Sequence, residues 1–124
     1  MKTIFLITFL LVGALVIYVN GFNYTALWNF LPAILGFAAF QGGLETSHAK
    51  AAGCFAFAFS ATLMVGHFHL SWLFDWGGTA TGSSTAALAF IFVPFWVVFF
   101  AAIIALAAWA ICRIFWAKAS GSMN

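Results

Sequence analysis

The sequence predicts an all-α membrane protein in which four transmembrane helices form a single bundle with both termini on the same side. Three observations predict this fold class. Of the 124 residues, 66% are hydrophobic and only 5% are charged, whereas a soluble domain needs about a quarter charged residues to solvate its surface. The apolar residues fall into four long runs separated by polar or glycine-rich breaks. If each run crosses the membrane once, every lysine and arginine falls on one side.

The composition also excludes several function classes. Four cations spread along the chain give a net charge of +2 and no basic stripe, so no nucleic-acid partner is expected. Cys54 and Cys112 lie inside apolar runs, where cysteine behaves as a small buried hydrophobe. Neither has the spacing of a metal site. We therefore expect no metal and no cofactor.

The first predicted span covers residues 3–20. Lys2 followed by an apolar run is also how a signal peptide begins. A cleavable signal would have small residues at its processing site, but Tyr18, Val19 and Asn20 stand there. We expect this segment to be retained as a transmembrane helix.

The second predicted span covers residues 25–43 and contains Pro32 in its first half. A membrane helix tolerates proline where neighbouring groups satisfy the freed carbonyl. The most polar hairpin of the chain follows at 41–50. Thr46 or Ser47 is predicted to cap the third helix.

The third predicted span covers residues 49–72, and we expect it to be the central packing helix. Small residues recur at intervals of four on two of its faces, which lets helices approach closely in lipid. One face carries Ala52, Ala56 and Ser60, and the other carries Ala58, Thr62 and Gly66. The pattern predicts partners on two sides.

The fourth apolar run covers residues 84–117 and is too long for one simple span. Some thirty residues of helix measure about 45–50 Å, against a hydrocarbon core of about 30 Å. Counting roughly 20 residues back from Arg113 places the membrane boundary near Pro94, so 84–93 is in excess. Either the helix is kinked at Pro94 or a half-inserted piece breaks there. We expect the kink, since proline kinks are common.

The positive residues predict the orientation. Lys2, Lys50, Arg113 and Lys118 all fall on the side of the termini, which the positive-inside rule assigns to the cytoplasm. The opposite face should carry an interfacial aromatic belt, formed by Tyr18, Tyr24, Trp28, Trp72 and Trp76. This arrangement predicts a multi-pass protein of a cell inner membrane with both termini cytoplasmic.

The main candidate site gathers polar residues at the outer end of the third span. It contains His67, His69, Ser71 and Asp75, with Ser84 beyond the following loop. Positions two apart in a helix point about 200° apart, so the two histidines cannot both bind one ion. The histidines have a structural or interfacial role, a proton or ligand role, or a metal or haem role. Haem usually needs histidines from two helices, and only this span has them at membrane depth.

Two further polar segments are candidates. The loop 75–85 is rich in glycine and hydroxyl residues and could approach a ligand, but a connecting loop in which Ser83 or Ser84 caps the fourth helix is the preferred interpretation. At the other side, Gln41, Glu45 and His48 could shuttle protons. We expect them instead to solvate an interfacial turn, with Glu45 near Lys50.

No nucleophile–base pair or cofactor fingerprint appears, so we do not expect an enzyme. The sequence predicts a small membrane protein that acts as a homo-oligomer or as an accessory or structural subunit of a membrane complex. Its partners would be the lipid bilayer and copies of itself or other membrane subunits. The alternative is a small channel or carrier in which His67, His69 and Asp75 line an outer opening.

Overall fold

The computed structural model describes residues 1–121 and is all-helical within them. Four long helices follow one another along the chain, each long and apolar enough to cross a membrane. They are α1 (Lys2–Asn20), α2 (Tyr24–Leu44), α3 (His48–Leu73) and α4 (Ala89–Gly121). The connection between α3 and α4 contains two short 3₁₀ helices, η1 (Trp76–Gly78) and η2 (Ala86–Leu88). The prediction of four apolar helices is confirmed.

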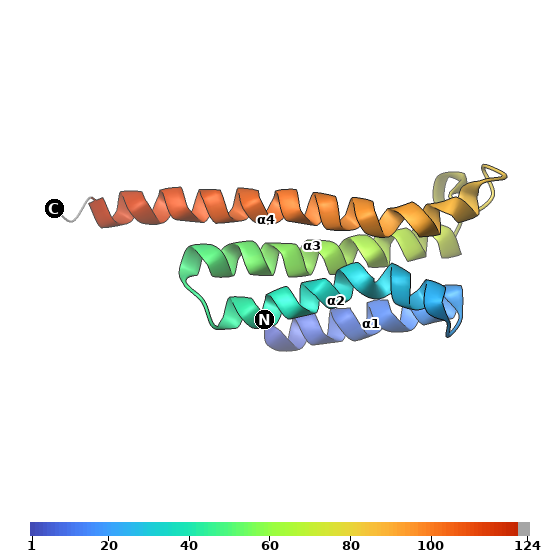
Figure 1. Ribbon diagram of the computed structural model, residues 1–124, viewed down its shortest axis with the longest axis horizontal. Coiled ribbons are helices and arrows are strands. Elements are labelled where there is room, and N and C mark those ends of the chain that lie inside the picture. The colour runs from blue at the N-terminus through green and yellow to red at the C-terminus, as the bar shows by residue number, and fades with distance from the viewer. Residues whose placement is uncertain (122–124) are drawn as a thin grey trace.

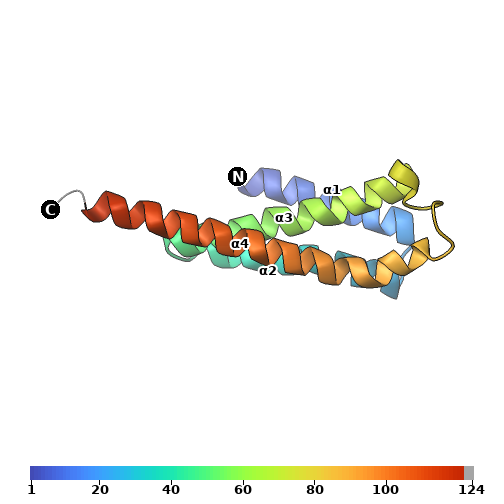
Figure 2. The same ribbon diagram turned by 90° about the horizontal axis from the view of Figure 1, so that it is seen from above.

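The helices alternate in direction, so the chain has two distinct ends (Figure 1). One end holds the N-terminus, the C-terminal end of α4 and the α2–α3 turn. We call it the cationic end because Lys2, Lys50, Arg113 and Lys118 belong to its segments. The other end holds the α1–α2 connection and the longer α3–α4 connection, and we call it the loop end. Figure 2 shows the same separation from above. All four lysines and arginines of the chain thus lie towards one end.

Helix α3 occupies the centre of the bundle. It contacts α1, α2 and α4, whereas no contact joins α1 to α4 within residues 1–121. Two glycines allow the close approaches. A Cβ on Gly36 of α2 would lie 3.1 Å from the Ala58 carbonyl oxygen of α3, and one on Gly53 of α3 would lie 3.2 Å from the Ala105 oxygen of α4. Backbone therefore meets backbone on two sides of α3.

The interior divides into two clusters. Towards the cationic end lies the aromatic cluster, formed by Phe5, Phe37, Phe40, Phe55 and Phe59 around Ala58. The rings of Phe5 and Phe40 stack with centroids 4.3 Å apart. Towards the loop end lies the aliphatic cluster, formed by Val12, Val16, Ala26, Ala33, Ala61, Val65, Val97 and Ala101. The two halves of the bundle are therefore filled by different kinds of side chain.

Helix α2 has a cap that the sequence analysis missed. The Oδ1 atom of Asn23 accepts the backbone N–H groups of Thr25 and Ala26, at 2.9 and 3.1 Å. These two donors have no partner inside the helix, so Asn23 defines where α2 begins. At α3, Ser47 stands at the N-cap position, but its side chain makes no capping hydrogen bond.

The start of α4 differs from the start predicted from the sequence. The helix begins at Ala89, not at residue 84, and neither Ser83 nor Ser84 caps it. The hydroxyl oxygen of Ser83 instead accepts the N–H of Thr85, a local turn that competes with helix formation. The helix then continues through Pro94, so the alternative of a half-inserted piece that breaks at that residue is not observed.

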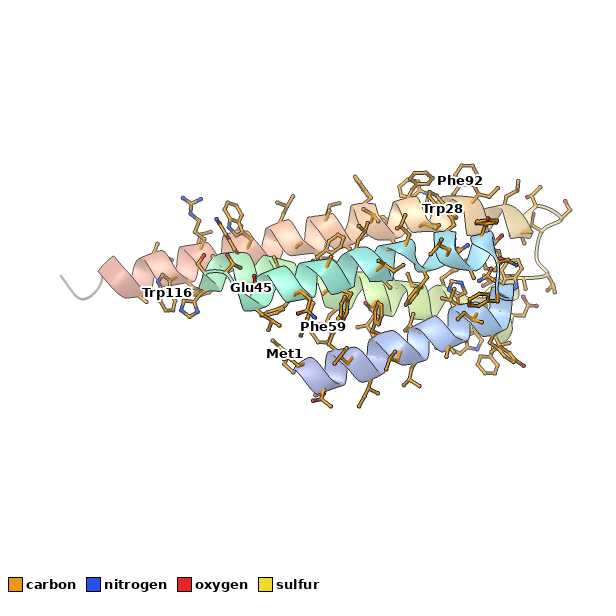
Figure 3. The ribbon with its side chains drawn as sticks, turned by 60° about the horizontal axis from the view of Figure 1, so that its bottom comes forward. Met1, Trp28, Glu45, Phe59, Phe92 and Trp116 are labelled. Atoms are coloured by element: carbon orange, nitrogen blue, oxygen red, sulfur yellow. The ribbon has the colours of Figure 1, made fainter. Side chains whose placement is uncertain are left out.

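The turn of α4 that precedes Pro94 is tied to α2. Proline has no N–H group, so the Phe90 carbonyl loses its usual helical partner. At the neighbouring carbonyl, Ile91, the indole Nε1 of Trp28 donates a hydrogen bond of 3.1 Å. The Trp28 ring also meets the Phe95 ring edge-on, at 5.2 Å. Trp28 lies towards the loop end, close to Phe92 of α4 (Figure 3).

Candidate functional site

The polar residues predicted to form an outer site do not converge on one point. His69 is fully buried, with 0% of its surface exposed, whereas His67 is exposed on another side of α3. Ser71 is buried one turn after His67, and Ser84 is exposed in the loop. The structure thus places two of these residues inside the bundle and two on its surface.

Buried His69 links α3 to α1. Its Nδ1 lies 2.8 Å from the Val65 carbonyl oxygen, and its Nε2 lies 3.0 Å from Nδ2 of Asn20. The same Asn20 amide donates to the Val16 carbonyl at 3.0 Å. Since a carbonyl only accepts and an amide nitrogen only donates, Nδ1 carries the proton and Nε2 accepts. Both nitrogens of this neutral imidazole are occupied, so neither is free to coordinate a metal or haem.

The aromatic rings around His69 come partly from residues 84–93, the segment expected to exceed the membrane thickness. The Phe90 ring meets His69 edge-on with centroids 5.8 Å apart, and it meets Trp72 at 4.4 Å. Phe68 lies against both His69 and Phe90. The first turn of α4 therefore packs over His69 and leaves His67 uncovered.

Asp75 organises the loop that follows α3. Its backbone is left-handed, with φ of 50°. Its Oδ1 accepts the N–H groups of Ala80 and Thr81, at 2.8 and 3.1 Å, and its Oδ2 accepts the Thr81 hydroxyl. The hydroxyl bond from Thr81 and the backbone bond from Ala80 lower the pKa of the Asp75 carboxyl. Asp75 is thus engaged within its own loop, while His69 is engaged with Asn20.

Two buried polar residues were not identified as site candidates on chemical grounds. Asn29 is 1% exposed and Thr62 is 0% exposed. The Nδ2 of Asn29 donates to the Thr25 carbonyl at 2.9 Å. Its Oδ1 and the Thr62 hydroxyl have no hydrogen-bond partner in the described part of the chain. An amide at membrane depth is a functional signal by itself, and Asn29 could have been found that way.

The two small-residue faces of α3 differ in burial. Ala58, Thr62 and Gly66 are buried, and a Cβ on Gly66 would lie 2.9 Å from Cγ2 of Val12 in α1. The other face is half-buried and comprises Ala52, Ala56 and Ser60. The Ser60 hydroxyl donates to the Ala56 carbonyl of its own helix. The first face therefore makes the tighter helix contact.

At the cationic end, α3 and α4 meet through rings. The His48 ring stacks on Trp116 with centroids 4.5 Å apart, and the Arg113 guanidinium lies 5.3 Å from the Trp109 ring centroid. Figure 3 shows Trp116 and Glu45 towards this end. Gln41 and Glu45 are exposed. Among residues 1–121 no group of three or more His, Cys, Asp or Glu side chains could hold a metal ion.

Comparison with protein-family models, with curated proteins and with solved structures found no match.

Proposed function

We propose that this protein is a non-catalytic polytopic membrane subunit that acts as a homo-oligomer or as an accessory subunit of a membrane complex. The observation that carries the proposal is the one-sided packing of α4. Two of its buried residues, Val97 and Ala101, belong to the aliphatic cluster. Helix α4 contacts α3 and α2, but no contact joins it to α1 within residues 1–121.

The uncovered face of α4 carries three neighbouring aromatic rings. Trp96, Phe99 and Phe100 are all exposed, and their ring centroids lie 5.5–6.1 Å apart. Large aromatic rings are enriched at protein interfaces because they bury much area with few rotatable bonds. Helix association in lipid depends on such packing. This face therefore suits contact with another membrane helix.

Cysteine crosslinking tests the proposal directly. Phe99→Cys, in a background where Cys54 and Cys112 are replaced by serine, should crosslink into dimers or to another subunit in native membranes. Leu10→Cys on exposed α1 is the matched control and should crosslink far less. Native mass spectrometry in mild detergent should show the same assembly. A strictly monomeric, partner-free protein in both experiments would contradict the proposal.

We further propose that the protein resides in a cell inner membrane with the cationic end in the cytoplasm. All four cations belong to segments of that end, in keeping with the positive-inside rule. We also propose a kink of α4 at Pro94, whose ring crowds the preceding turn. Labelling of single cysteines from either side of sealed vesicles tests the orientation: residues 46 and 118 should react from the cytoplasm.

A second candidate function is a small channel or carrier, and the buried polar side chains favour it. His69, Asn29 and Thr62 all lie inside the loop half of the bundle, where polar groups often serve ion or proton pathways. The version in which His67, His69 and Asp75 line an opening predicts lower flux for His67→Ala in liposomes. A flux equal to that of empty liposomes would contradict the transport proposal altogether.

A further inference from the structure

A groove runs between α1 and α3 near the loop end. It has a volume of about 570 Å³. Its walls include Leu11, Val12 and Leu15 of α1 and Leu63 of α3, and its lining also includes His67 and Trp76. Because the groove opens on the outside of a bundle of apolar helices, hydrocarbon chains of the bilayer have access to it.

The two polar rings of this groove have unmatched hydrogen-bonding groups. The His67 and Trp76 rings lie 6.1 Å apart. Both are exposed, and neither makes a hydrogen bond with any residue of the described chain. Hydrocarbon cannot satisfy an imidazole or indole N–H. His67 lies six residues before the end of α3, about 9 Å along the axis, so we expect its ring near the polar boundary of the bilayer.

The loop fixes Trp76 beside the groove. Asp75, the residue before it, takes the left-handed conformation and binds the amides of Ala80 and Thr81. These bonds close the loop around η1. Trp76 thus belongs to a turn that is stabilised by hydrogen bonds, and its indole lies next to the ring of His67.

We propose that this groove binds one glycerophospholipid of the leaflet at the loop end. One acyl chain lies along the apolar walls, and ester or phosphate oxygens accept hydrogen bonds from His67 and Trp76. The groove has apolar walls along its length and two hydrogen-bond donors at its outer end. A phospholipid matches this arrangement, because its acyl chain is apolar and its oxygen acceptors lie at the headgroup end.

A second groove of about 570 Å³ lies between α1 and α2. Its walls at membrane depth are apolar, including Val16, Leu27 and Phe30. At its rim, the Asn23 side chain is already bonded to backbone groups. An acyl chain could contact this second groove, but no histidine of residues 1–121 lines it. Lipid labelling of the second groove can therefore be compared with labelling of the α1–α3 groove.

Photolabelling of the whole protein in nanodiscs tests the site. The probe is phosphatidylethanolamine with a diazirine on one acyl chain. Labels should concentrate on the peptides around residues 11–15 and 63–70. His67→Leu combined with Trp76→Phe keeps a large apolar side chain at each position and removes the donors, so labelling at limiting probe should fall roughly two- to tenfold per lost bond.

A variant that fills the groove separates the site from general lipid contact. Leu63→Trp adds bulk to an exposed wall residue and should abolish the labels at 63–70. Leu10→Trp, on an exposed α1 position that does not line the groove, should leave them unchanged. Labels spread evenly over all exposed helices, or unaffected by Leu63→Trp, would overturn the proposal. If the double variant fails to fold by circular dichroism, the Leu63→Trp result decides.

Discussion

In the half of the bundle nearest the cationic end, Phe5 and Phe40 stack face to face and the other rings of the aromatic cluster close around them. In the half nearest the loop end, the interior instead includes the imidazole of His69 and the amide of Asn29 among small aliphatic residues. Lipid provides no hydrophobic driving force between helices. The first half therefore depends on shape and dispersion, and the second depends in part on directional hydrogen bonds.

This difference predicts how each half responds to substitution. Removing a ring from the aromatic cluster leaves a void, whose cost grows with its volume. Removing a hydrogen-bonded group from the loop half costs less on average, since interhelical hydrogen bonds in membranes contribute modestly.

The largest effect is expected for Phe40→Ala. Phe40 is buried and contacts Phe5, Phe55 and Phe59, so its removal should lower the free energy of unfolding by about 3 kcal/mol. The measurement is reversible unfolding in mixed micelles. Phe92→Ala, at an exposed α4 position, is the control and should change stability little. Equal losses for the two variants would show that the aromatic cluster does not carry this half of the bundle.

Gly36→Ala should have the second-largest effect. The new Cβ would lie 3.1 Å from the Ala58 oxygen and 3.2 Å from its Cα, so α2 and α3 must separate at a cost of about 1–2 kcal/mol. Gly42→Ala is the matched control in the same helix, with nothing within 4 Å of its Cβ. It should be neutral or slightly stabilising because alanine favours helix. Thermal denaturation of the two variants distinguishes them.

A double-mutant cycle between Asn20→Ala and His69→Ala tests the polar link of the loop half. The coupling energy should be about 1 kcal/mol, as for other interhelical hydrogen bonds in membranes. Ser60→Ala paired with His69→Ala is the control, because the Ser60 hydroxyl bonds to its own helix. That pair should show no coupling. A zero value for Asn20 and His69 would mean that their contact adds nothing to stability.

The smallest effect concerns the loop around Asp75. Its hydrogen bonds lower the carboxyl pKa below the ordinary 3.8, so the ionised form stabilises the folded loop. This contribution is fully present above that pH and is lost as the pH falls through the lowered pKa. The protection of the Ala80 and Thr81 amides against exchange, measured relative to an unstructured peptide at the same pH, should therefore be high at neutral pH and fall under acid conditions.

Asp75→Asn should raise the exchange of these two amides at neutral pH, because a neutral amide accepts hydrogen bonds less strongly than a carboxylate. Ser84→Ala, at an exposed position of the same connection, should leave the exchange unchanged. Identical exchange in wild type and Asp75→Asn would contradict the assigned role of this carboxylate.

Much of the fold could be predicted because hydropathy alone determines which segments prefer lipid. Each end of the predicted spans 3–20, 25–43 and 49–72 lies within one residue of the corresponding end of α1, α2 or α3. The start of α4 was predicted poorly because a serine such as Ser83 can serve equally as a helix cap or as a turn residue. In the structure the Ser83 hydroxyl bonds to the Thr85 hydroxyl and to the Thr85 N–H, which forms a turn. The choice between cap and turn depends on how the whole loop packs.

Of the candidate site, only the features that follow from helix geometry could be predicted. The divergence of His67 and His69 follows from the helical repeat. The contact between Asn20 and His69 joins residues 49 positions apart, and a single sequence contains no signal that pairs them. The burial of Asn29 likewise depends on which face α2 presents to α3, and the low amphipathicity of an apolar helix leaves that face undetermined.

The hydrogen bond from Trp28 to the Ile91 carbonyl has a consequence for the surface that faces lipid. The close contact of Gly53 with Ala105 already limits how α4 can rotate against α3. The bond from Trp28 to a single carbonyl near Pro94 adds a directional contact to α2, so two neighbouring helices hold α4 in one orientation about its axis. Trp96, Phe99 and Phe100 are therefore displayed in one constant direction, as a neighbouring subunit would need.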